Sequence, residues 1–101
     1  MIVRIWQGWT NHQNADDYER LLITKIIPEI RSRNIQGLGE IEVLRREAVN
    51  EIEFMTIYYF DSIEDIKQMA GDDPERAYVP ESARKLLKRF EDTARHFEKK
   101  Y

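Results

Sequence analysis

Two histidines are the side chains of this sequence best suited to move a proton near neutral pH. His96 precedes Phe97 near the end of the chain, and His12 lies in the polar stretch 10–14. A histidine, whose ordinary pKa is about 6.5, can take a proton from an activated phenol or enol. A histidine that only forms a hydrogen bond at a sheet edge or a subunit contact is the commoner case, and His12 is typical of a solvated loop. His96 is therefore the candidate base, with that structural role as its alternative.

Aromatic side chains gather in two apolar stretches and suggest a pocket for a flat organic ligand. Tyr58 is the candidate for a hydroxyl group in this pocket, because a buried phenol needs a hydrogen-bond partner. Trp6, Phe54 and Phe60 are the candidate walls that bind the substrate. The alternative for each ring is packing in the core or at an interface. Strand alternation predicts one face with Phe54, Tyr58 and Phe60, and an opposite face with Met55, Ile57 and Tyr59.

Three arginines, Arg4, Arg45 and Arg46, lie in stretches expected to be strands and could form a basic patch on the sheet. Such a patch could hold an anionic substrate, although charges of this kind are more often solvated and paired with carboxylates. Their spacing does not decide between these two roles. Over the whole chain 19 Asp and Glu outnumber 16 Lys and Arg, so we expect no nucleic-acid partner.

Several kinds of cofactor chemistry lack the residues that they need. The chain has no cysteine, which excludes thiolate nucleophiles, disulfides and cysteine-bound metals. No histidine and carboxylate stand at the spacing of metal ligands on a helix. Gly37 and Gly39 begin like a dinucleotide-binding loop, but Glu42 replaces the third glycine and a strand is predicted to follow. We therefore expect neither a metal ion nor an organic cofactor.

The length and composition predict one globular domain, residues 1–101. Of these residues 42% are hydrophobic and 35% are charged, which is typical of a folded domain. The N-terminus has a charge inside its first apolar stretch and lacks the apolar core of a signal peptide. The longest apolar stretches, 21–27 and 54–60, are shorter than the roughly 20 residues of a membrane span. We expect a cytoplasmic protein with no membrane partner.

Hydrophobic periodicity predicts the elements that would position these side chains. Residues 2–9 are rich in branched and aromatic side chains and predict a strand. Asn14 is suited to cap a helix, and apolar residues at helical spacing follow it. Pro28 should kink or end this helix, because it lacks an amide donor and crowds the carbonyl of Thr24.

Two further strands, 41–47 and 51–60, should form a hairpin that turns at Asn50. The second strand is apolar on both faces, so both of its faces need a cover. Helices can cover one face, but a chain of this size can hardly supply a second layer. We therefore expect a partner subunit on the other face.

The last third of the chain begins with a short predicted helix and ends ambiguously. Ser62 and Asp65 form a capping box, and Gly71 closes the helix that they start. Apolar residues then keep helical spacing over 83–97, which favours one long helix. A final strand over 91–99 is the alternative.

The order of strand, helix, hairpin, helix and possible strand is that of a ferredoxin-like βαββαβ unit. On this pattern the sequence resembles the antibiotic biosynthesis monooxygenase-like family. The resemblance covers nearly the whole chain as patterns of side-chain type. The matching segments are I-V-R-I-W-Q-G-W-T at 2–10, I-I-P-E-I at 26–30, E-I-E-F-M-T-I-Y-Y-F-D-S-I-E-D-I at 51–66, A-G-D-D at 70–73, V-P-E-S-A-R at 79–84 and R-H-F-E at 95–98.

The resemblance implies an α+β fold in which an antiparallel sheet carries helices on one face and two copies form a dimeric α+β barrel. It implies that 91–99 is the fourth strand and that a second copy covers the open face of strand 51–60. We therefore expect a homodimer through the sheet face. His96 falls where the family often places a histidine followed by an aromatic residue.

The resemblance also implies a cofactor-independent monooxygenase that acts on a small aromatic or quinol-like substrate. There, the deprotonated substrate itself passes an electron to oxygen, with His96 or Tyr58 as base or hydrogen-bond partner. Haem degradation on the same fold is not expected, because the first strand has no asparagine and both tryptophans precede residue 10. The alternatives are a non-catalytic dimeric domain that binds a small apolar ligand or acts as a scaffold, and a small isomerase or decarboxylase on the same barrel.

Overall fold

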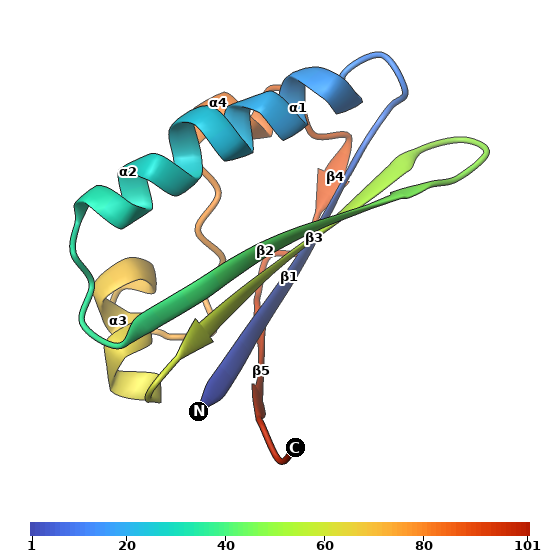
Figure 1. The fold of residues 1–101 in the computed structure, drawn as a ribbon. Helices are drawn as coiled ribbons and strands as arrows, with labels where there is room; N and C mark the ends of the chain where they lie inside the picture. The colour runs from blue at the N-terminus through green and yellow to red at the C-terminus, as the bar shows by residue number, and fades with distance from the viewer.

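The computed structural model describes residues 1–101 as an antiparallel sheet of five strands with all helices packed on one of its faces (Figure 1). The strand order is β2-β3-β1-β4, and β5 also pairs with β1. This arrangement is consistent with a ferredoxin-like α+β fold. The strands are β1 (Ile2–Thr10), β2 (Leu38–Glu47), β3 (Ile52–Phe60), β4 (Arg89–Phe90) and β5 (Arg95–Glu98), and the helices are α1 (Ala15–Leu21), η1 (Leu22–Ile26), α2 (Ile27–Ser32), α3 (Ile63–Ala70) and α4 (Glu81–Arg84).

The predicted alternation of β3 is confirmed, because its side chains are buried at every second position. Phe54 and Phe60 are fully buried under the helices, and the ring of Phe54 meets that of Tyr18 edge-on at 4.9 Å. Met55 and Ile57 point to the opposite face and are half-buried. The hairpin of β2 and β3 is also confirmed, with Val43 opposite Thr56.

The helix after β1 does not end at Pro28, which corrects the prediction of an early end. It continues to Ser32 because a π-helical turn, η1, precedes the proline. There the amide of Ile27 donates to the carbonyl of Leu22, five residues back, so the helix is wider than an α-helix just before the proline ring. Asn14 takes the predicted N-cap position of α1, where its carbonyl accepts from the amide of Tyr18 at 2.9 Å. Its side chain, however, makes no cap bond and donates instead to the carbonyl of Leu86 at 3.3 Å.

The predicted cap of α3 is confirmed at Ser62, whose hydroxyl accepts from the amide of Asp65 at 3.3 Å, and Gly71 ends the helix with φ +90°. The reciprocal half of the capping box differs, because the carboxylate of Asp65 accepts from the Ser62 hydroxyl at 3.0 Å. Gly37 precedes β2 with φ +81°, a conformation that favours glycine. A Cβ atom there would also collide with the carboxylate of Asp65. Local sequence therefore defines both ends of α3 and the entry to β2.

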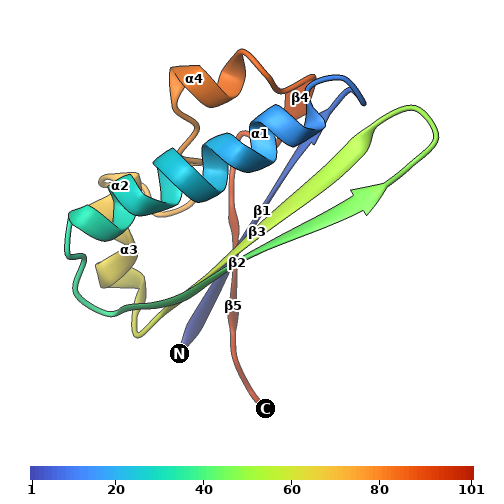
Figure 2. The same ribbon diagram turned by 45° about the horizontal axis from the view of Figure 1, so that its top comes forward.

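The long C-terminal helix predicted from spacing is wrong, and the strand alternative is closer to the structure. Only α4, a single turn, is helical after Gly71, and the chain then pairs with the edge of β1. After Glu91, whose amide still donates to the carbonyl of Gln7, residues 92–94 leave that edge. The bridge of Thr93 to Arg76 holds them against the connection 71–80 instead. β4 and β5 are therefore two pieces on one edge, separated by this excursion (Figure 2).

The core lies between the helical layer and the sheet. Its largest fully buried apolar side chains come from α1, α2, α3 and β3: Tyr18, Ile30, Ile52, Phe54, Phe60 and Ile66. No helix of the chain has the length and apolar character to cross a membrane.

Candidate functional site

A small cavity opens between the sheet and the helical layer. Four of its lining residues come from β1 and β3: Arg4, Trp6, Thr56 and Tyr58. The hollow measures about 390 Å³ including a part open to solvent, but only about 20 Å³ of it can hold the centre of a water molecule. That space corresponds to about one or two water molecules. The other lining residues are Tyr18, Leu22, Ile26, Met69, Tyr78, Val79, Pro80 and Ala83.

Arg4 places a positive charge at the wall of this cavity. Its position on β1 directs the side chain toward the helices, and the residue is 1% exposed. Its Nη1 donates a hydrogen bond to the carbonyl oxygen of Pro74, and its Nη2 donates one to the carbonyl oxygen of Arg76 at 2.7 Å. Burial lowers the pKa of Arg4, but an arginine remains charged. No carboxylate forms an ion pair with it, so carbonyl oxygens and one ring nitrogen are its partners.

That ring nitrogen belongs to His96, which lies opposite Arg4 in the pairing of β5 with β1. Nη1 of Arg4 is 2.9 Å from Nε2 of His96. Because a guanidinium only donates, Nε2 accepts and the ring proton is on Nδ1. Burial and, second, the charge of Arg4 lower the pKa of His96, so the ring is neutral at pH 7. His96 does not line the cavity and reaches it only through Arg4.

Two hydroxyl groups share the sheet side of the cavity with Arg4. Tyr58 lies directly opposite Arg4 in the pairing of β3 with β1, and burial raises its pKa to about 12, so it is a protonated donor. Thr56 is opposite Trp6 and is 1% exposed. The Thr56 hydroxyl is buried without any hydrogen-bond partner. The hydroxyl of Thr10 is also buried without a partner, but Thr10 does not line the cavity.

The structure brings only part of the predicted site together. Tyr58 and Trp6 line the cavity, and the indole nitrogen of Trp6 donates to the carbonyl of Glu91 at 2.7 Å. Phe54 and Phe60 share the face of Tyr58 but are packed in the core away from the cavity. His12 is exposed in its loop, with Nε2 2.8 Å from the carbonyl of Val49.

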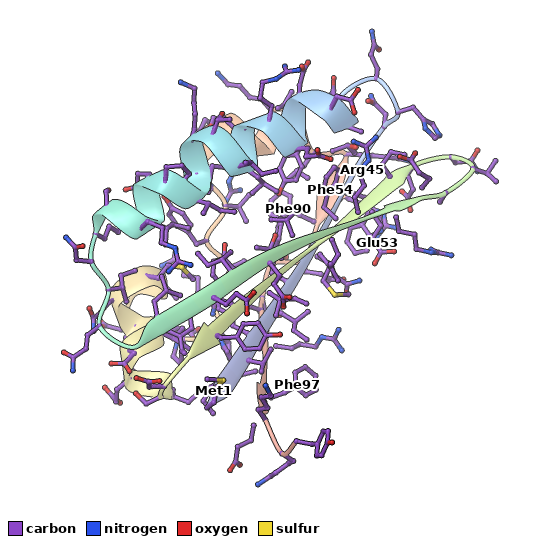
Figure 3. All side chains as sticks on the ribbon, viewed as in Figure 1. Met1, Arg45, Glu53, Phe54, Phe90 and Phe97 are labelled. Atoms are coloured by element: carbon purple, nitrogen blue, oxygen red, sulfur yellow. The ribbon has the colours of Figure 1, made fainter.

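The predicted basic patch is wrong, because the three arginines have different surroundings. Arg45 lies on the helix side, where Asp16, Glu19 and Glu47 pair with it at 2.8–3.1 Å. Arg46 points to the opposite face, and only Arg4 enters the cavity. Figure 3 shows Arg45 and Phe54 on the helix side of the sheet and Glu53 on the other side.

Sequence reasoning missed Thr56 and assigned Arg4 to a surface patch. One signal could have found both. On a strand with a buried face, Arg4 alternates with Ile2 and Trp6, and Thr56 alternates with Phe54 and Tyr58. A charged or hydroxyl side chain in a buried register is costly unless it has a partner, and such groups are candidates for ligand contact.

Comparison with known proteins adds no identification: no family model matches the chain, and no curated protein matches it. The chain also has no group of three or more histidine or carboxylate side chains placed to hold one metal ion. The residues of the cavity therefore carry the functional argument.

Proposed function

We propose that this chain binds a small phenol or quinol-like molecule in the cavity between sheet and helices and, as a homodimer, oxidises it with molecular oxygen without a cofactor. The observation that carries the proposal is a mainly apolar cavity into which a buried guanidinium and a protonated phenol project. Apolar walls with a few convergent polar groups are typical of small-molecule sites.

The reaction needs little from the protein beyond binding and stabilisation of charge. A phenol loses its proton, and the phenolate passes one electron to dioxygen. Recombination with the superoxide that forms gives a peroxide on the ring carbon opposite the hydroxyl. That carbon then loses its hydrogen as a proton while the O–O bond breaks, so one oxygen atom stays on the ring as the second carbonyl of a quinone and the other leaves as water. Tyr58 would donate to the substrate oxygen, Trp6 would contact the ring, and His96 would act as a positioning residue through Arg4.

A ring-sized substrate requires the cavity to widen. The present space holds one or two water molecules, and Tyr78, Val79 and Pro80 form part of its wall. These three residues belong to the connection between α3 and α4 and lie outside any helix or strand. Such connections move more readily than packed elements, so we place the entry of the ring there.

Oxygen uptake tests the catalytic part of the proposal. With a panel of anthrones and of phenols that carry a hydrogen opposite the hydroxyl, we expect the chain to consume one oxygen molecule for each quinone formed. Tyr58→Phe should slow the reaction about 10- to 100-fold, because it removes one donor to a charged oxygen. Tyr101→Phe is the matched control, since Tyr101 is fully exposed at the C-terminus. Equal rates with the protein and with buffer alone would end the oxygenase proposal.

The second candidate function is binding without catalysis. The small cavity favours it, as does the position of His96, which has no direct access to a bound substrate. Tight binding of a phenol together with no oxygen uptake across the panel would support this second function.

The proposed homodimer rests on the open face of the sheet. Val3, Ile5, Met55 and Ile57 form a half-buried apolar strip there, and Phe97 extends it at 47% exposure. An isologous contact pairs a surface with itself, and this face carries charges of both signs around the strip, among them Arg46, Arg95, Glu42 and Glu53. With β4 and β5 read as one interrupted strand, the order becomes βαββαβ, and two such sheets face to face would form a dimeric α+β barrel.

A further inference from the structure

We propose that Arg4, Thr56 and Tyr58 form an anion-binding site, and that the cavity takes the charged oxygen of a small organic anion, a phenolate or a carboxylate. This inference deepens the proposed function, on which it rests for the cavity, because it states that the ligand is bound in its ionised form. It is carried by three side chains with polar groups that the fold itself leaves without full partners.

The first step is the burial of a charge without a counter-ion. Arg4 is 1% exposed and has no ion pair, whereas the arginines that do form ion pairs keep their side chains at least 26% exposed. A buried charge is costly unless it is paired with an opposite charge. In Arg4 the counter-charge is missing from the chain. A ligand that carries a negative charge would supply it.

The second step is a count of donors. A guanidinium has five N–H groups. Three of them are used, on the carbonyls of Pro74 and Arg76 and on Nε2 of His96. Two therefore remain, one on Nη2 and one on Nε, in a side chain that lines the cavity.

The third step is the convergence of two hydroxyl groups on the same wall. Thr56 and Tyr58 are 1% and 7% exposed, and both line the cavity. They stand at alternate positions of β3, so both project to the helix side, and Tyr58 is the direct partner of Arg4 across the strands. The Thr56 hydroxyl has no partner, and the Tyr58 hydroxyl stays protonated and can donate. Arg4, Thr56 and Tyr58 thus each keep a group that can donate to a ligand in the cavity.

A purely structural role for Arg4 explains fewer of these observations than an anion-binding site does. Its bonds to Pro74 and Arg76 do fasten the connection 71–80 to the sheet. They do not explain why the Thr56 hydroxyl lies unpartnered on the same wall, or why a space for one or two water molecules is left beside it. A charged oxygen of a ligand is about the size of that space.

The site would also change the acidity of its ligand. A positive charge and hydrogen-bond donors favour the ionised form of a phenol and lower its pKa. The proton of the phenol can then leave to solvent water as the phenolate forms, so no base inside the cavity is needed. This agrees with the position of His96 outside the cavity.

Titration with 4-nitrophenol tests the inference, because its ionised form alone absorbs in the visible range. We expect the phenolate to bind more tightly than the neutral phenol, and the pKa of the bound molecule to fall. Arg4→Met, Thr56→Val and Tyr58→Phe should each weaken phenolate binding, by about 10- to 100-fold for the charged partner and about 2- to 10-fold for a hydroxyl. Formate serves as a second probe. If it competes with nitrophenolate, the site also binds carboxylates; if it does not compete, the site binds phenolates only.

Thr10→Val is the matched control, because Thr10 also has a buried, unpartnered hydroxyl but lies outside the cavity. It should leave phenolate binding unchanged. If Arg4→Met fails to fold, the phenolate affinities of Thr56→Val and Tyr58→Phe still test the anion site. Equal affinity for phenol and phenolate, no binding of either probe, or normal binding in both hydroxyl variants would overturn the anion site. Phenolate binding without oxygen uptake would instead end the oxygenase proposal and leave the anion site standing.

Discussion

The two faces of the strand pair β1 and β3 differ in how deeply their side chains are buried and in whether polar or apolar groups lack a partner. On the helix face, Phe54 and Phe60 are fully buried, and the polar residues Arg4, Thr56 and Tyr58 lie among them around a small cavity. On the open face the side chains are only half-buried and are mostly apolar along the centre of the sheet. Figure 3 shows the two faces, with Phe54 on one side and Glu53 and Phe97 on the other.

This difference indicates what each face lacks. On the helix face the hydrophobic side chains are covered by the helices, but the polar groups of Arg4, Thr56 and Tyr58 lack full hydrogen-bond partners. A small ligand in the cavity could supply these partners. At the margin of the open face some charged groups have partners within the chain, as in the bond from the hydroxyl of Tyr59 to Glu42 at 2.7 Å. Its apolar centre, in contrast, has no cover within the chain. One face is therefore short of an anion and the other of a second layer.

The largest effect should come from Phe54, on the helix face. Phe54→Ala removes a fully buried ring that packs on Tyr18, and we expect a loss of about 3–5 kcal/mol in the free energy of unfolding. Urea denaturation followed by circular dichroism measures it. Met55→Ala is the control on the open face of the same strand and should cost less. If both cost the same, the two faces do not differ as the structure indicates.

The next effect concerns association of the open face. Ile57→Glu places a carboxylate at the middle of the apolar strip, and in the proposed homodimer two such charges would meet without partners. We expect the dimer to weaken by roughly 100-fold or more, which is about 3 kcal/mol. Analytical ultracentrifugation of both proteins at micromolar concentration measures it. A stable monomer of about 12 kDa for the unchanged chain would contradict the dimer.

The sequence predicts most of the fold because its signals are local or periodic. Alternation along 51–60 separates the faces of β3, and Ser62, Asp65 and Gly71 define α3. The C-terminal segment cannot be predicted in this way. Its helical spacing competes with the free edge of β1, whose backbone groups need partners, and the tertiary contact prevails over the local pattern.

The site was harder to predict than the fold. Tyr58 and Trp6 could be placed by alternation, because only the period of a strand is needed. The role of Arg4 depends on the connection 71–80 and on β5, which fold over it from far along the chain. The exclusion of Phe54 and Phe60 from the cavity depends on how the helices pack, which no pattern in β3 specifies.

A smaller effect should separate two threonines on the helix face. Thr10→Val removes a buried hydroxyl without a partner and keeps the shape, so we expect a gain of about 1 kcal/mol in the free energy of unfolding. Thr56→Val should gain less, because a water molecule in the cavity can partner the Thr56 hydroxyl. Urea denaturation of both variants measures the difference. A loss of stability in Thr10→Val would show that its hydroxyl has a partner after all.

The smallest effect should be the dependence of stability on the charge of His96. The folded protein lowers the pKa of His96 below the ordinary value through burial and the charge of Arg4, so the unfolded chain takes up a proton first as the pH falls. This contribution to stability is complete above the unfolded pKa of about 6.5 and declines as the pH falls from there toward the lower folded pKa. Thermal melts between pH 7.5 and about 5.5, where most carboxylates stay ionised, should show a small decline. His96→Gln should flatten it, whereas His12→Gln, a change in an exposed loop, should not. An unchanged slope in His96→Gln would mean that Arg4 and His96 are not coupled on the helix face in the way that their 2.9 Å contact indicates.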